Sequence, residues 1–201
     1  KILFFLIFII ILYFLYRFFY IENFNKKTEK DNDIYNASVV RIRSQNKNFN
    51  WEEPYLEGET YESIGTGFFY NNEGYIITNF HVISDSISVL IQIPKIGNKT
   101  FNSKIISIYP KLDIALLQIQ DYKNESFLQF NLKPINKGDK VLALGYPLGQ
   151  DKLKLTSGII SGFQNGDIQT DSAINNGNSG GPLLKDNKVV GINYSGYDDA
   201  Q

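Results

Sequence analysis

Residues 170–183 have the sequence TDSAINNGNSGGPL, in which Ser179 stands between Gly177 and Gly180. A serine hydroxyl is a weak nucleophile at neutral pH, and it needs a neighbouring base and donors for the oxyanion that it forms. Glycines beside the serine permit a tight turn that exposes the hydroxyl and directs backbone N–H groups toward one point. A flexible Gly/Ser turn is the alternative. The six-residue sequence GNSGGP at residues 177–182 has a predicted strand on each side, which favours a nucleophile.

The base that Ser179 requires has a single histidine candidate, because His81 is the only histidine of the chain. It lies at the end of an apolar segment, residues 74–83, with the sequence GYIITNFHVI. A lone histidine is more often structural than catalytic. The serine motif changes that balance, and we predict that His81 is the general base.

A third residue, an acid, would hold the imidazole in one tautomer and stabilise its charged form. Asp113 is the best candidate, because it opens the apolar segment DIALL and is expected to be buried by its strand neighbours. Asp85 is too close to His81 in sequence, and Asp171 more plausibly organises the loop before the serine. The acids between His81 and Ser179 include Asp85, Asp113, Asp121, Glu125, Asp139, Asp151, Asp167 and Asp171. The order His, Asp, Ser is that of chymotrypsin.

Short runs of β-branched and aromatic residues follow one another after residue 35, separated by Gly, Asn, Asp and Pro. Such runs are typical of strands. We predict strands at residues 38–42, 67–70, 75–78, 87–93, 105–109, 114–119, 140–144, 155–161, 167–169, 182–184 and 189–193. No segment after residue 30 has a sustained helical period, so an all-β barrel or sandwich is expected. The break at residues 121–138 suggests two small packed barrels, at residues 36–125 and 135–201.

The N-terminal segment is of a different kind. Arg17 is its only charge between Ile2 and Ile21, and about twenty apolar residues match a hydrocarbon core of about 30 Å. We predict a transmembrane anchor at residues 1–21 and a polar linker without periodicity at residues 22–35. A cleaved signal peptide is the main alternative, although no small-x-small cleavage site follows, and a buried core helix is a weaker one. The flanking charges leave the orientation ambiguous.

Composition excludes several classes of function. The 20 basic and 21 acidic residues nearly cancel, so no nucleic-acid partner is indicated. The chain has no cysteine, and no histidine or carboxylate cluster has metal-ligand spacing. We therefore predict neither a metal nor a cofactor.

Five motifs occur in a fixed order, at residues 65–68, 74–82, 112–117, 144–149 and 170–183. Together they resemble the HtrA/DegP branch of the trypsin-like serine proteases over about residues 36–195. The resemblance implies two six-stranded β-barrels of the chymotrypsin type, with His81 and Asp113 from the first and Ser179 from the second. It also implies an oxyanion hole formed by the backbone N–H groups of Gly177 and Ser179.

Several features depart from that family or from its digestive relatives. Asn176 stands where the family usually has proline, so a less rigid loop is expected before the serine. Asn178 replaces the aspartate of digestive trypsins, which makes activation by N-terminal cleavage improbable. The closing strand, helix and PDZ domain of relatives lie beyond the sequence, so the second barrel is expected to be incomplete with an unpaired edge.

Specificity is predicted from the position six places before the serine, which is the base of the primary pocket in trypsin-type enzymes. Here it is Ala173, with Ile174 and Ile192 expected nearby. The absence of an acid at that position predicts a preference for small or medium aliphatic side chains.

The sequence therefore predicts a membrane-anchored serine endopeptidase with polypeptide substrates. The resemblance implies unfolded or damaged proteins as substrates and a trimer as the assembly, and the protease domain is expected on the non-cytoplasmic side of the membrane. A catalytically silent protease-fold binding module is the alternative from another class, and an esterase is a remote one.

Overall fold

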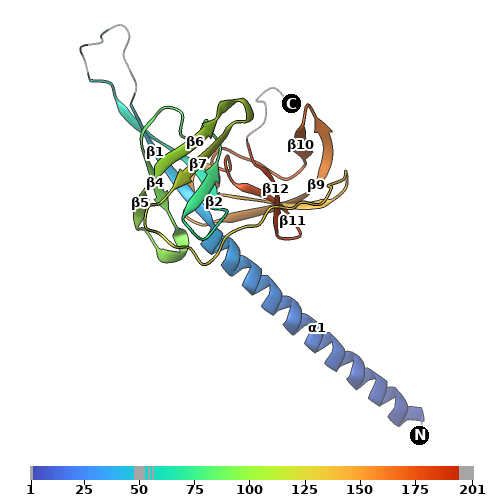
Figure 1. Cartoon of the computed structure of the whole chain (residues 1–201). Coiled ribbons are helices and arrows are strands. Elements are labelled where there is room, and N and C mark those ends of the chain that lie inside the picture. The colour runs from blue at the N-terminus through green and yellow to red at the C-terminus, as the bar shows by residue number, and fades with distance from the viewer. Residues whose placement is uncertain (1, 48–52, 54, 56, 195–201) are drawn as a thin grey trace. The chain divides into compact units, whose positions relative to one another are not determined.

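The computed structural model describes residues 2–47, 53, 55 and 57–194, and side chains from residue 10 onward (Figure 1). The contacts divide the chain into two compact units, residues 1–35 and residues 36–201.

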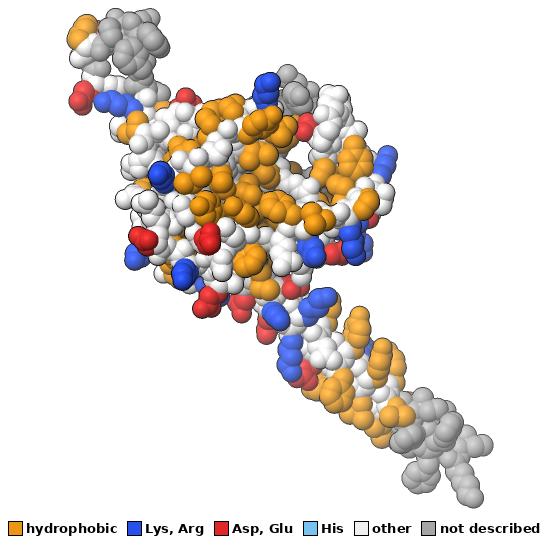
Figure 2. Space-filling model, viewed as in Figure 1, with side chains coloured by type: hydrophobic (Ala, Val, Ile, Leu, Met, Phe, Trp, Pro, Cys, Tyr) orange, Lys and Arg blue, Asp and Glu red, His pale blue; other side chains and the backbone are white. Residues whose placement is uncertain are grey.

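The first unit lies in α1 (Ile2–Ser38), a helix of 37 residues that contains neither glycine nor proline. Its polar part contains the helical ion pair Lys26–Glu22 at 2.7 Å, a spacing that supports helix. Residues 22–35, predicted as a polar linker because their sequence lacks periodicity, continue this helix, and their role as a linker stays a prediction. Its apolar part exposes large side chains, among them Phe14, Tyr16 and Phe18 (Figure 2).

Among the described residues, no helix has the length and apolarity that crossing a membrane requires. The transmembrane anchor stays a prediction from the sequence.

The second unit contains two antiparallel sheets, so the prediction of an all-β domain is confirmed. The first sheet has the strand order β5-β4-β1-β2-β3-β7-β6. Its strands are β1 (Val39–Lys47), β2 (Thr60–Phe69), β3 (Tyr75–Thr78), β4 (Ser86–Gln92), β5 (Thr100–Asn102), β6 (Lys104–Tyr109) and β7 (Ile114–Gln118). The two edge strands, β5 and β6, are separated in sequence by Ser103 alone. The ends of the sheet must therefore meet, so β5 and β6 act as one bent strand of a six-stranded barrel.

The interior of this barrel is apolar. Val40 and Ile42 of β1, Ile76 of β3 and Leu117 of β7 belong to one cluster of buried side chains. Alternation along β1 places Arg41 and Arg43 on the opposite face. The short helices η1 (Pro94–Ile96) and η2 (Pro110–Leu112) connect strands of this barrel.

The second sheet has five strands among the described residues, in the order β10-β9-β8-β11-β12. They are β8 (Lys140–Gly145), β9 (Lys154–Gln164), β10 (Asp167–Thr170), β11 (Pro182–Lys185) and β12 (Lys188–Ile192), and the short helix η3 (Pro147–Gly149) follows β8. The outermost strands in this order are β10 and β12, and Phe130 makes an isolated parallel bridge with Val189 of β12. Val141, Ala143, Ile160 and Leu183 form its buried cluster.

The two sheets are joined through buried polar contacts. The Tyr146 hydroxyl, directly after β8, donates to the Val39 carbonyl oxygen of β1 at 3.2 Å. Burial raises the pKa of this phenol above its ordinary value, so it remains a neutral donor. The Thr66 N–H of β2 donates to the Ser179 carbonyl oxygen at 2.8 Å. The loop that bears Ser179 is thereby fixed to the first barrel.

Candidate active site

His81 and Asp113 are brought together by the pairing of β3 with β7. Thr78, the last residue of β3, is opposite Ala115 of β7, so the residues after β3 lie beside those before β7. His81 Nδ1 is 2.6 Å from Asp113 Oδ2, and the His81 backbone N–H donates to Asp113 Oδ1 at 2.8 Å. Both carboxylate oxygens of Asp113 are thus directed at the same histidine.

The main chain of Asp113 is held as firmly as its side chain. Its carbonyl oxygen accepts hydrogen bonds from the Asn79 amide at 2.9 Å and from the Phe80 N–H at 3.0 Å. Asp113 lies in the turn between η2 and β7, with a left-handed φ of 52°. Its side chain is 34% exposed, so the prediction of a buried position was wrong. The turn position, outside the strand proper, is the reason.

Three of the other acids between His81 and Ser179 form hydrogen bonds with residues other than His81. Asp85 accepts a hydrogen bond from the Ser84 hydroxyl at 3.1 Å. Asp139 lies 2.5 Å from Lys185, whose hydrogen bond lowers the pKa of that carboxyl below its ordinary value. Asp171 accepts from the Ile159 N–H at 2.6 Å, and this contact ties the loop before the serine to β9.

The loop that bears Ser179 is clamped by Thr66 of β2. The Thr66 hydroxyl donates to the Gly177 carbonyl oxygen at 2.6 Å and accepts from the Tyr146 N–H at 3.1 Å. The Thr66 carbonyl oxygen accepts from the Thr78 hydroxyl at 2.7 Å. One threonine therefore connects the residues around Ser179 with the end of β3, close to His81.

The predicted oxyanion donors are two backbone N–H groups, and the carbonyl oxygen of the same peptide bond accepts a hydrogen bond in each case. The Asn176 carbonyl oxygen accepts from the Leu148 N–H at 2.7 Å, and the Asn178 carbonyl oxygen accepts from the Gly181 N–H at 3.0 Å. Within the described part of the chain, no hydrogen bond uses the N–H of Gly177 or Ser179 as its donor. The predicted oxyanion hole needs two N–H groups of one loop that are not used within the protein, and these two fit that requirement.

The structure does not join all three predicted catalytic side chains. Among the described residues, no hydrogen bond connects the Ser179 hydroxyl with His81. The loops themselves touch, since a Cβ on Gly180 would lie 3.1 Å from the Asn79 nitrogen, two residues before His81. Catalytic hydrogen bonds are often long or poorly aligned in structures without substrate.

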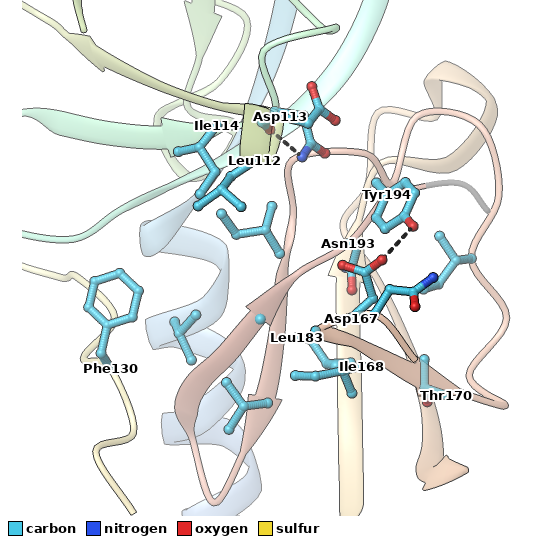
Figure 3. Close-up of a pocket in the computed structure, with 18 of the residues that line it drawn as sticks. Leu112, Asp113, Ile114, Phe130, Asp167, Ile168, Thr170, Leu183, Asn193 and Tyr194 are labelled. Atoms are coloured by element: carbon cyan, nitrogen blue, oxygen red, sulfur yellow. Dashed lines mark hydrogen bonds between the residues drawn. The ribbon is translucent and has the colours of Figure 1, made fainter. Parts of the chain in front are cut away.

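A cavity of about 730 Å³ lies between the two edges of the second sheet and the turn at Asp113 (Figure 3). Ile174 and Ile192, predicted for the substrate pocket, both line it, together with Leu183 and Val190. Ala173 does not, and its carbonyl oxygen accepts from the Thr156 hydroxyl at 2.9 Å. An acid is also present in the cavity wall: Asp167 accepts a hydrogen bond from the Tyr194 hydroxyl at 3.4 Å.

Two residues of the site were not predicted as parts of it. Thr66 lies just before the strand predicted at residues 67–70, whereas the structure places it within β2, and Asn79 had no assigned role. The functions of Thr66 and Asn79 depend on contacts with residues far away in sequence. The available sequence signal was that each lies in one of the five ordered motifs. Groups of three or more metal-binding side chains were not found among the residues described.

Comparison with known proteins relates the second unit to proteases. Residues 65–192 match the family model of the trypsin-like peptidase domain. A DegP-like periplasmic serine endoprotease of Chlamydia muridarum is 41% identical over 140 residues, which is 64% of this chain and 27% of the relative. The corresponding protein of Bartonella henselae is 38% identical over 65% of this chain and 27% of its own length. The magnetosome formation protease MamE of Magnetospirillum gryphiswaldense is 37% identical over 68% of this chain and 19% of its own length. The chain thus matches less than a third of the length of each of these relatives.

Proposed function

The chain belongs to the trypsin-like peptidase family, and from this premise we propose that it is a serine endopeptidase that hydrolyses peptide bonds through His81, Asp113 and Ser179. The observation that supports this most strongly is the double contact between His81 and Asp113, at 2.6 and 2.8 Å. A carboxylate on Nδ1 keeps a proton there and leaves Nε2 as an acceptor. That is the tautomer that a general base for serine requires.

The proposed reaction has two stages. His81 Nε2 takes the proton from the Ser179 hydroxyl as its oxygen attacks the substrate carbonyl carbon, and the N–H groups of Gly177 and Ser179 stabilise the resulting oxyanion. His81 then gives the proton to the leaving amine, and an acyl-enzyme remains. In the second stage His81 takes a proton from water as the water oxygen attacks the acyl carbon. His81 then returns that proton to the Ser179 oxygen as the ester bond breaks, which releases the acid product and restores both residues.

The proposal is tested by covalent labelling of the full chain with a fluorophosphonate probe, followed by mapping of the labelled residue by mass spectrometry. We expect the label on Ser179, and none on the variants Ser179→Ala and His81→Ala. Ser161→Ala is the matched control, because Ser161 is an exposed serine of β9 outside the site, and it should label like the parent chain. A folded parent chain that remains unlabelled would refute the proposal and favour a silent binding module.

We further propose that the cleaved bond follows a small or medium aliphatic residue, because Ile174 and Ile192 line the same cavity beside Leu183 and Val190. Cleavage of a peptide library by the full chain should show this preference. The alternative specificity, cleavage after Lys or Arg, would depend on Asp167, because an acid in the cavity wall could pair with a basic side chain of the substrate. A preference for Lys or Arg that disappears in Asp167→Asn would contradict the aliphatic assignment.

The setting of the enzyme is also a proposal. The names of the DegP-like relatives place them in the periplasm, which supports a protease domain on the non-cytoplasmic side of a membrane. The apolar residues 2–21 support an anchor, and failure of the full chain to float with liposomes would contradict it. Unfolded or damaged polypeptides as substrates and a trimeric assembly are inferred from the family alone.

A further inference from the structure

The direction of the Gly177 N–H is set by a residue outside the serine loop. This N–H belongs to the peptide bond between Asn176 and Gly177, and the carbonyl oxygen of that bond accepts from the Leu148 N–H at 2.7 Å. None of the peptide bonds between described residues is cis, and in a trans peptide the C=O and N–H groups point in opposite directions. Leu148 therefore determines where the proposed oxyanion donor points.

Leu148 itself adopts a conformation that needs support. Its φ and ψ are 53° and 28°, in the left-handed region that costs a non-glycine residue energy, and Gly149 follows with φ 71°. Two consecutive left-handed residues make a sharp bend at η3. The Leu148 side chain is exposed, so packing does not fix this bend.

Arg41 of β1 holds the bend from the first barrel. Its guanidinium donates from Nη2 to the Gly149 carbonyl oxygen and from Nη1 to Asp151 Oδ1, both at 2.7 Å. Arg41 is 9% exposed, whereas the Asp151 side chain is 86% exposed. A nearly buried guanidinium of β1 thus binds the loop after β8 through two hydrogen bonds.

The backbone position of Arg41 is fixed because β1 lies inside the first sheet. β1 is paired on one side with β2 and on the other with β4, and Arg41 itself is opposite Thr66 and Gln92. The guanidinium offers several donors in a fixed plane, and a lysine in its place would offer one mobile charge. The three donors of a lysine ammonium lie on one atom and rotate freely, so lysine would not keep Gly149 and Asp151 in the geometry that the guanidinium imposes.

We propose that Arg41 is a positioning residue for the oxyanion hole: it fixes the bend at Leu148 and Gly149, and through the Leu148 N–H it orients the N–H of Gly177. This inference rests on the proposed function, because it assigns a role in the same reaction. Arg41 touches none of the reacting groups.

The test is steady-state hydrolysis of a peptide substrate by the full chain carrying Arg41→Lys. We expect kcat to fall by about 30-fold, because the donor is misdirected rather than removed, and removal of one donor costs about 100- to 1,000-fold. KM should stay within about twofold, since ground-state binding does not need the oxyanion hole. Asp151→Asn, which removes the charge of the exposed partner of Arg41, should lower kcat by a smaller factor.

Arg43→Lys is the matched control. Arg43 lies two residues further along the same face of β1 and pairs with Glu62 at 2.7 Å, away from the loop. Its kcat should remain within about twofold of the parent chain, since exposed pairs contribute little. A folded Arg41→Lys variant with the same kcat as Arg43→Lys, or with an equal change in KM, would overturn the positioning role. A parent chain without turnover would instead overturn the proposed function.

Discussion

Replacement of Asp113 by asparagine is expected to lower kcat by about 10,000-fold while the chain still folds. The reason is the tautomer of His81. The amide oxygen of asparagine can still accept the His81 backbone N–H, which Asp113 Oδ1 accepts now at 2.8 Å. The amide nitrogen would then face Nδ1 and donate to it, so the imidazole proton would move to Nε2. A protonated Nε2 cannot take the proton of Ser179.

Two measurements check this expectation. Peptide hydrolysis should show the fall in kcat with little change in KM, and fluorophosphonate labelling of Ser179 should slow in parallel, because both need the same base. Asp85→Asn is the control, since Asp85 is a nearby acid that contacts Ser84. Its activity should equal that of the parent chain. Turnover of Asp113→Asn within tenfold of the parent would show that another residue orients His81.

Site residues that lie in local sequence motifs could be predicted, whereas those whose roles depend on contacts with distant residues could not. His81, Asp113 and Ser179 each lie in a distinct motif, so their residue types and order were enough to group them. Arg41 and Arg43 have no such distinction, because both alternate with apolar residues on the same strand. What separates them is the loop at residues 147–151, more than a hundred residues away, and no local pattern contains that information.

The fold shows the same limit. Most strands were predicted from short apolar runs, but residues 22–35 were predicted as a linker because their polar residues have no helical period. Residues 23–30 of α1 are all exposed, and a helical segment that buries no face needs no such period. The absence of Gly and Pro, together with pairs such as Lys26–Glu22, supports continuation of the helix there. Burial of Asp113 was inferred from its apolar neighbours, although the turn before β7 leaves the side chain partly exposed.

Replacement of Gly180 by alanine is expected to be the most damaging change to stability among the loop glycines. A Cβ at this position would lie 2.1 Å from the Thr66 carbonyl oxygen and 2.2 Å from the Thr78 hydroxyl, and φ is 84°. The Thr66 backbone cannot retreat, because it is paired with Arg41 in the middle of the first sheet. We expect a loss on the order of 4 kcal/mol or more in the free energy of unfolding.

Thermal unfolding followed by circular dichroism measures this loss, which corresponds to a fall in Tm of about 10 °C or more. Gly166→Ala separates the close approach from backbone strain, since Gly166 has φ 95° but no atom within 4 Å of the position of a Cβ. That control should lose only about 1 kcal/mol, the cost of a left-handed alanine. Equal losses in the two variants would mean that the contact of Gly180 with Thr66 is unimportant. A loss confined to Gly180→Ala, together with loss of Ser179 labelling, would support the view that contact of the serine loop with β2 is needed for both the fold and the nucleophile.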